Sequence, residues 1–229
     1  MKRSGWLRGA AWVAAIAGVF ATIAALQHGR ARPSRVDAPL IPTAPDVVAT
    51  QPVPAVPDPG RLATAAAAQI GVTVGYDPSY VRLAYPGGDV PADRGVCSDV
   101  VVRACRAVGI DLQRALHEDM AIAFAAYPRR WNLTKPDRNI DHRRVLNLMT
   151  WFERRGWSRP ISADPRGYAP GDIVAWDLGA SLTHIGVVVD DGQGGRAIVH
   201  NIGAGAQREA VLFAWRQIGH YRLPGAVIR

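Results

Sequence analysis

The residues of this chain best suited to covalent chemistry are its two cysteines and its histidines. Cys97 and Cys105 lie eight residues apart in the segment RGVCSDVVVRAC. Apolar residues recur there at helical spacing, which predicts one helix from Val96 to Gly109. Eight helical residues separate two Cα atoms by about 12 Å, whereas a disulfide needs less than about 7 Å. The two thiols are therefore not expected to pair.

The two cysteines differ in their place on the predicted helix. Cys105 lies mid-helix on the apolar stripe, as a small buried hydrophobic residue would. Cys97 falls in the first turn, where free N–H groups and a partial positive charge favour a thiolate and lower its pKa. The same N–H groups can hold an oxyanion formed by attack on a carbonyl. Position alone leaves Cys97 equally open as a nucleophile and as a core residue.

A nucleophilic cysteine needs a base, and the base needs an orienting group. His184 begins the segment HIGVVVD, and His200 lies near the end of RAIVHNIG. If the hairpin between them centres near Gly192, the two histidines lie opposite each other, about 5 Å apart on one face. A register shift of one would bring Asn201 there instead. The third member of the site is thus open between His200 and Asn201.

The pattern along the chain predicts helices followed by an antiparallel sheet, which is an α+β fold. A Pro-Gly-Asp turn precedes the first long strand, and YVRLAY followed by YPGGDV suggests one earlier hairpin. The expected helices cover residues 61–70, 96–109, 117–131 (stopped at Pro128) and 141–156, and the expected strands cover 172–178, 183–191, 196–203 and 219–224.

The first 26 residues predict export. Residues 9–26 form an uncharged, mostly apolar run of 18 residues preceded by Lys2, Arg3 and Arg8. Such a run is typical of a signal peptide or a signal anchor, and 18 helical residues span about 27 Å, near the thickness of a bilayer core. Without a convincing A-x-A cleavage site we favour an anchor, with the N-terminus inside. The folded part is then expected in the periplasm, tethered to the inner membrane.

Residues 27–60 hold many prolines and predict an extended spacer without a core. Residues 61–229 remain as one globular domain. The net charge of +8 is spread over short runs mixed with acids, so no nucleic-acid partner is expected. A zinc site from Cys97, His184 and His200 lacks any CxxC or HExxH spacing in support, and no cofactor is predicted. The sequence does not indicate an oligomeric state.

Three segments, GVCSDVV, YAPGDIVAW and HIGVVVDDGQGGRAIVHNIG, resemble the NlpC-like, papain-related cell-wall peptidases and amidases. The resemblance implies helices packed on an antiparallel sheet. It also implies Cys97 as the nucleophile, His184 as the general base and His200 as the orienting residue. Gly171 and Asp172 correspond to a structural turn.

From about residue 70 to 224 the chain also resembles the bacterial domain-of-unknown-function family numbered 1287. The matching pieces are YDPSYVRLAYPGGDVPADRGVCSDVV, HEDM, NIDHRRVLNL and VHNIGAG. This resemblance implies the same fold and export. Asp99 departs from many NlpC-like enzymes, which have an apolar or aromatic residue there. It would contact substrate or favour the first helical turn. The segment NIDHRRVLNL would either line a substrate groove through His142, or begin a helix with Asp141 as its N-cap and with its arginines solvated.

Two functions follow as expectations. The first is a cell-envelope thiol hydrolase, a peptidase or amidase whose Cys-His-His triad cleaves an amide bond in peptidoglycan stem peptides. An acyl transferase with the same residues is a variant of it. The second is a non-catalytic envelope-binding or assembly module that retains the fold.

Overall fold

The computed structural model of this chain describes residues 58–224. The predicted anchor and all but the end of the predicted spacer lie outside these residues. Within residues 58–224, none of the helices has both the length and the apolar character that a membrane crossing requires.

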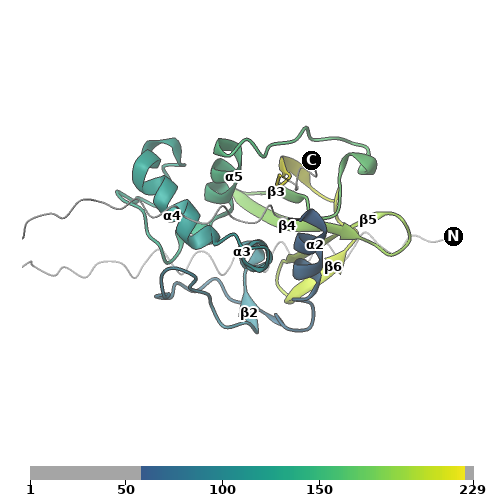
Figure 1. Cartoon of the computed structure of the whole chain (residues 1–229), viewed down its shortest axis with the longest axis horizontal. Helices are drawn as coiled ribbons and strands as arrows, with labels where there is room; N and C mark the ends of the chain where they lie inside the picture. Colours follow the sequence, from purple (N-terminus) through teal and green to yellow (C-terminus); the bar gives the residue numbers. More distant parts are fainter. Residues whose placement is uncertain (1–57, 225–229) are drawn as a thin grey trace, which may run out of the picture. The chain divides into compact units, whose positions relative to one another are not determined.

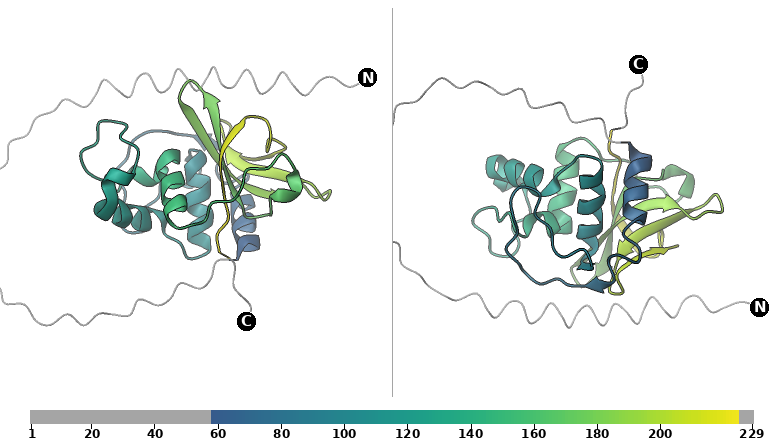
Figure 2. Two further views of the ribbon diagram at one scale, coloured as in Figure 1. Left: turned by 90° about the horizontal axis from the view of Figure 1, so that it is seen from above. Right: turned by 60° about the horizontal axis from the view of Figure 1, so that its bottom comes forward.

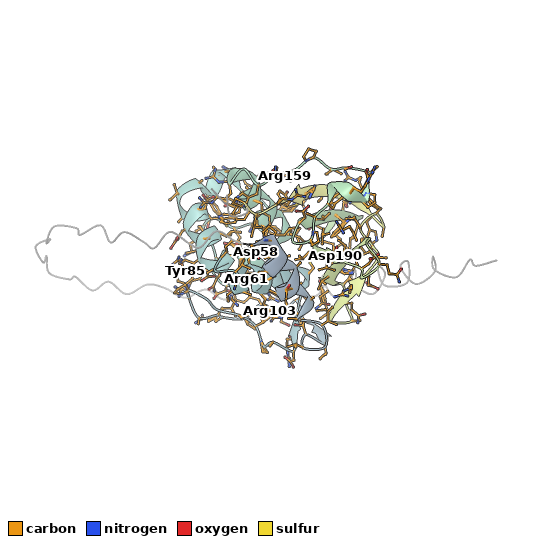
Figure 3. The ribbon with its side chains drawn as sticks, turned by 45° about the vertical axis from the view of Figure 1, so that its right-hand side comes forward. Asp58, Arg61, Tyr85, Arg103, Arg159 and Asp190 are labelled. Carbon is orange, nitrogen blue, oxygen red and sulfur yellow. The ribbon has the colours of Figure 1, made fainter. Side chains whose placement is uncertain are left out.

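Of the four α-helices in the described part, two begin after an aspartate whose side chain caps the first turn. Asp58 accepts a hydrogen bond from Gly60 N–H, and Pro59 occupies the first turn of α2. Asp58 and Arg61 lie at the exposed start of that helix (Figure 3). The helices are α2 (Pro59–Ala67), α3 (Cys97–Ala107), α4 (Leu112–Ala123) and α5 (Val145–Arg154), with 3-10 turns η2 (Phe124–Ala126), η3 (Asp141–Arg143) and η4 (Pro165–Gly167).

Two predicted helices have wrong bounds. The helix expected over residues 117–131 begins at Leu112, because the Asp111 side chain accepts from the N–H groups of Gln113 and Arg114. It ends at Ala123, before Pro128 is reached. The helix expected over 141–156 divides at Arg144, which has extended backbone angles between η3 and α5. Asp141 is therefore not the N-cap of the longer helix.

The sheet has five antiparallel strands in the order β6-β5-β4-β3-β7, so the α+β prediction is confirmed. The predicted hairpin in YVRLAY is wrong, since residues 80–85 form no strand. The four-residue strand β6 was not predicted. The strands are β3 (Ile173–Gly179), β4 (Leu182–Asp190), β5 (Arg196–Asn201), β6 (Ala206–Glu209) and β7 (Arg216–Tyr221), and a small parallel pair joins β1 (Gly75–Tyr76) to β2 (Arg94–Gly95).

Both faces of the sheet are covered. Alternate residues of β4, including Ile185 and Val187, pack against the core formed with α2, α3 and α5, which lie on one face of the sheet (Figures 1 and 2). Val188 points to the second face, into a smaller cluster with Trp176 and Leu212. Burial on both faces explains why β4 is continuously apolar from Ile185 to Val189 rather than alternating.

The Pro-Gly-Asp turn before β3 is structural, as expected. A side chain at Gly171 would place its Cβ 2.1 Å from the Pro59 carbonyl oxygen. Asp172 is fully buried and accepts hydrogen bonds from His220 Nε2 at 2.7 Å and Arg222 Nε at 2.6 Å. Burial raises the pKa of Asp172, but these hydrogen bonds outweigh that effect and hold the pKa below its ordinary value.

Candidate active site

Cys97 is the first residue of α3. The Val96 N–H before it donates to Asp99 Oδ2 at 2.6 Å, and this contact closes the first turn. Gly95 leaves room for it, since a Cβ there would lie 2.9 Å from the same carboxylate oxygen. Both thiols are free and buried, but Cys97 retains 6% of its surface whereas Cys105 retains none.

Asp99 belongs to the framework of the site. Its carboxylate accepts from Arg143 Nε at 2.9 Å and from Arg143 Nη2 at 2.9 Å, and both side chains are almost completely buried. The same guanidinium donates to the carbonyls of Ser79 and Asp77. Of the two roles expected for Asp99, the structure therefore favours support of the first helical turn.

Neither of the two roles expected for the segment NIDHRRVLNL accounts for its burial. His142 is 2% exposed, and burial lowers its pKa to about 4. Arg143 is 6% exposed and paired with Asp99, so it is not a solvated arginine. The segment supports the start of α3 from inside, and Ser98 Oγ donates to the Arg143 carbonyl at 2.7 Å.

Asn201 hydrogen-bonds to β2, the short strand that precedes Cys97. Its Nδ2 donates to the carbonyls of Gly75 and Gly95, each at 3.0 Å, and its Oδ1 accepts from Gly203 N–H. These bonds tie the short β1–β2 pair to the end of β5. With its amide engaged there, Asn201 does not contact His184.

His200 is the residue that the structure places beside His184. His184 Nε2 and His200 Nδ1 are 2.7 Å apart, and both side chains are buried. The predicted pairing is nevertheless wrong by two residues, because Val187 lies opposite Val199 and His200 therefore lies opposite Gly186. An even shift keeps both imidazoles on one face.

The glycine in His-Ile-Gly makes this contact sterically feasible. A Cβ at Gly186 would lie 2.6 Å from Ile198 Cγ2 and 3.1 Å from His200 Cβ. Because the position opposite His200 carries no side chain, His184 can reach it diagonally. Diagonal neighbours across an antiparallel pair are within reach of rings.

Two tryptophans enclose the imidazole pair. The Trp176 and Trp215 rings each lie 5.8 Å from the His184 ring, measured between centroids. Burial, and then the neighbouring His200, lower the pKa of His184 well below its ordinary value. His184 is therefore neutral at pH 7 and has a lone pair available to accept a proton.

The thiol of Cys97 lies beside the backbone of Ile185, the residue that follows His184. A hydrogen bond from that backbone lowers the pKa of Cys97, as do the N–H groups of Ser98 and of Cys97 itself. Burial is the larger effect and raises the pKa to about 12. The expectation that the helix start yields a thiolate is therefore wrong for this state, in which the thiol is neutral.

Among the hydrogen bonds of residues 58–224, none joins the Cys97 thiol to His184. Cys97 packs with the helix-side core, whereas His184 leaves β4 toward the other face of the sheet, beside Trp176. Hydrogen bonds between catalytic groups are often formed only when substrate is bound.

We expect Cys97 to be alkylated by iodoacetamide faster than Cys105, but slowly at pH 7. Burial raises the pKa of both thiols to about 12, so the thiolate fraction of each rises about tenfold per pH unit between pH 7 and pH 10. The greater exposure of Cys97 gives it the faster rate. Peptide mapping by mass spectrometry across this pH range measures both rates. A rate at Cys97 that is constant from pH 6 to pH 9 would mean a thiolate and contradict the neutral assignment.

Three further residues surround these groups and were missed in the sequence. Tyr76 lies close to Cys97. Burial raises the pKa of the Tyr76 hydroxyl, and a negative charge on Cys97 would raise that pKa further. Trp215 covers the histidine pair. Glu209 Oε2 lies 2.9 Å from His200 Nε2. Only recognition of strand β6 could have pointed to Glu209, and a strand of four residues gives almost no periodic signal.

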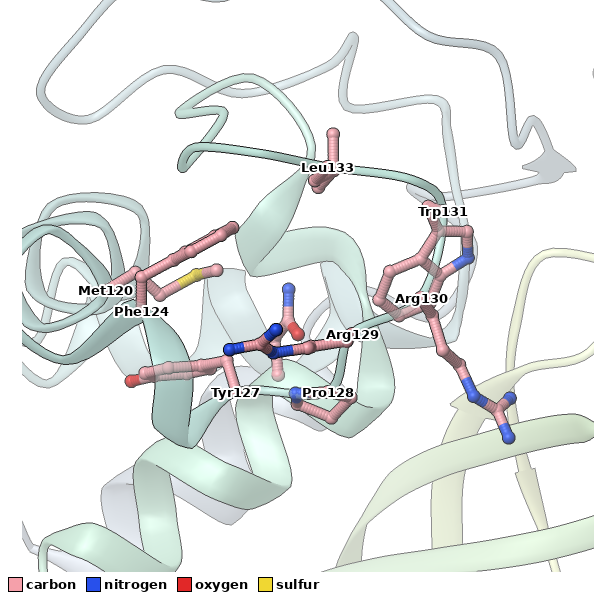
Figure 4. Close-up of a pocket in the computed structure, with 9 residues that line it drawn as sticks. Met120, Phe124, Tyr127, Pro128, Arg129, Arg130, Trp131 and Leu133 are labelled. Atoms are coloured by element: carbon pink, nitrogen blue, oxygen red, sulfur yellow. The ribbon is translucent and has the colours of Figure 1, made fainter.

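A small pocket elsewhere is separate from these residues. It lies among the ends of α4 and α5 and the loop after η2 (Figure 4), and it includes Asn147, whose Oδ1 is buried without a partner. The pocket is lined by Met120, Phe124, Tyr127, Pro128, Arg129, Arg130, Trp131, Leu133 and Asn147.

No group of three or more His, Cys, Asp or Glu side chains suited to a metal ion occurs within residues 58–224.

Comparison with known proteins gives three results. The model of the domain of unknown function DUF1287 matches residues 63–223. The protein of Escherichia coli strain K12 named uncharacterized protein YijF is 59% identical over 163 residues, which cover 70% of this chain and 80% of that protein. The structure of NlpC1 from Trichomonas vaginalis aligns with a TM-score of 0.40 at 13% identity, covering 75% of this chain and 46% of that one. The chain thus spans less than half of NlpC1.

The family match includes every residue of the candidate site, from Tyr76 to Glu209. The identity to the Escherichia coli relative extends over nearly the same length of chain. This chain belongs to the DUF1287 family.

Proposed function

We propose that this protein is a thiol hydrolase that cleaves an amide bond, with Cys97 as nucleophile, His184 as general base and His200 as the orienting residue. The supporting observation is the buried contact of 2.7 Å between His184 Nε2 and His200 Nδ1. The residue that follows His184 on β4, Ile185, hydrogen-bonds the Cys97 thiol through its backbone. A cysteine at a helix start, a neutral base and a group that orients the base are the components of covalent acyl transfer.

The reaction begins from a neutral thiol and a neutral imidazole. His184 takes the proton of Cys97 as the sulfur attacks the substrate carbonyl carbon, and the carbonyl electron pair moves onto oxygen. Backbone N–H groups at the start of α3, those of Cys97 and Ser98, have no intrahelical acceptor and would bind this oxyanion.

The second half of the reaction returns the proton. Collapse of the tetrahedral intermediate breaks the C–N bond, and His184 protonates the departing amine. Water then attacks the thioester with His184 as base, which releases the carboxylic acid and restores the thiol. An acceptor amine in place of water would make the same site an acyl transferase.

We further propose that the substrate is a peptide stem of peptidoglycan. The apolar run at residues 9–26 and the proline-rich spacer fit a domain held in the periplasm by the inner membrane. A net charge of +8 favours an anionic polymer over a neutral one. The dispersed charge gives no support to a nucleic-acid partner.

The test is digestion of purified peptidoglycan by the full-length chain, with released fragments identified by mass spectrometry. We expect fragments with new amine and carboxyl ends, produced by the unmodified protein and by Cys105→Ala but not by Cys97→Ala. Identical fragments from the unmodified protein and Cys97→Ala would refute the assignment of the nucleophile.

A second candidate, the non-catalytic envelope-binding module, is favoured by one observation, the burial of all but 6% of Cys97. It predicts that the unmodified protein and Cys97→Ala sediment equally with peptidoglycan while neither releases fragments. The same digestion therefore separates the two functions.

A further inference from the structure

The contacts of the histidine pair continue beyond His200. His200 Nε2 lies 2.9 Å from Glu209 Oε2, so the carboxylate contacts His200, which in turn contacts His184, across three adjacent strands. The two atoms are within hydrogen-bonding distance, but no straight N–H···O bond is formed in this conformation, and rotation of the half-exposed Glu209 carboxylate would be needed to align one. The His200 side chain is fully buried, whereas 45% of the Glu209 side chain is exposed.

Strand register explains how Glu209 reaches His200. Gln207 lies directly opposite His200, and Glu209 lies opposite Ile198, two residues away on the same face. A glutamate is long enough to bridge this diagonal. The placement depends on β6, the short edge strand that follows the turn after Asn201.

The charge of Glu209 has no competing cation. Within residues 58–224 no lysine or arginine forms an ion pair with Glu209, and the titratable side chains in contact with His200 are His184 from β4 and Glu209 from β6. The interaction with His200 lowers the pKa of Glu209 although partial burial opposes it. Glu209 is therefore ionised at neutral pH, directed at a single imidazole.

A carboxylate oxygen can only accept a hydrogen bond, and a neutral imidazole carries one N–H. The proton of His200 is therefore assigned to Nε2, the ring nitrogen 2.9 Å from the Glu209 carboxylate, and its Nδ1 becomes an acceptor. His184 Nε2 must then donate to His200 Nδ1, which leaves His184 Nδ1 unprotonated. This is the atom that a general base needs free.

We propose that Glu209 is a positioning residue that fixes the tautomers of His200 and His184 and so keeps His184 Nδ1 available to the Cys97 proton. The proposal rests on the proposed function and extends it from three residues to four. When His184 Nδ1 accepts the thiol proton, its Nε2–H remains bonded to His200, and the new positive charge is stabilised by the Glu209 carboxylate through the neutral ring between them.

The test reads the tautomers directly, by nitrogen-15 NMR of histidine side chains in the full-length chain at pH 7.5. We expect His184 and His200 both to be protonated at Nε2. In Glu209→Leu, a buried Nε2–H of His200 would lose its acceptor, so we expect the Nδ1–H form to increase at both rings. Glu209→Gln retains an acceptor oxygen and is expected to keep the original tautomers. Gln207→Leu, on the same strand and face, is the matched control and should change neither ring.

Two outcomes would overturn the proposal: His200 protonated at Nδ1 in the unmodified protein, or unchanged tautomers in a folded Glu209→Leu. The first needs no variant, so the proposal stays testable even if Glu209→Leu does not fold. The spectra require no substrate and are independent of whether peptidoglycan is cleaved. If it is cleaved, loss of the charge in Glu209→Gln should lower kcat by about tenfold or more with little change in KM, since acid–base catalysis as a whole contributes about 10²- to 10⁴-fold.

Discussion

Replacement of Cys97 by serine is expected to lower kcat/KM for peptidoglycan fragments by about 10⁴-fold or more and to leave the fold intact. The hydroxyl is far less acidic than the thiol, and His184, whose pKa is already lowered by burial, cannot deprotonate it effectively. Stability should change little, because the first turn of α3 is held by the Val96–Asp99 contact and not by the thiol. Fragment release and thermal unfolding measure the two effects.

The same substitution at Cys105 provides the control, on the same helix. Cys105 is fully buried in the apolar core, where a serine hydroxyl would lack a partner. We therefore expect Cys105→Ser to lower the free energy of unfolding by about 1–3 kcal/mol while kcat/KM is retained. Loss of activity in both variants, in step with loss of stability, would show that Cys97 has a packing role and would contradict nucleophilic catalysis.

Replacement of Arg143 by methionine is expected to lower the free energy of unfolding by about 3–5 kcal/mol. The substitution leaves the Asp99 carboxylate buried without its cation, since both side chains of this pair are at most 3% exposed. It also removes the hydrogen bonds to the carbonyls of Asp77 and Ser79. Denaturant unfolding of the full-length chain gives the change.

Arg94→Met is the matched control for this loss. Arg94 pairs with Asp93 at the surface, where the two side chains are 49% and 56% exposed, so its removal should change the free energy of unfolding very little. Asp99→Asn combined with Arg143→Met should destabilise by less than the sum of the single variants, because the two residues share one interaction. Similar small losses in Arg143→Met and Arg94→Met would contradict a supporting role for the buried pair.

Local pattern was sufficient for much of the fold and for part of the site. Helices followed by an antiparallel sheet were read correctly because long amphipathic or β-branched runs carry their own periodicity. The placement of Cys97 at a helix start followed from the apolar stripe behind it. The common face of His184 and His200 was predicted even though the register was wrong, because any even shift preserves the face.

Helix starts were predicted less well than helix existence. Asp111 is a strong cap, but the apolar stretch after His117 drew the predicted start several residues too late. Arg144 interrupts a segment whose composition is helical throughout, and only the packing of η3 against α3 explains the break. Caps and breaks depend on single contacts, which periodicity does not report.

The sequence by itself determined which residues can do the chemistry and on which elements they lie. Tertiary structure decided their states and partners. It assigned Asp99 to Arg143 and Asn201 to the β1–β2 strands, and it kept the Cys97 thiol neutral. It also brought Glu209 to His200 across an edge strand of four residues. The physical reason is that protonation depends on burial and on nearby charges, and both are set by segments distant in the chain that meet only when it folds.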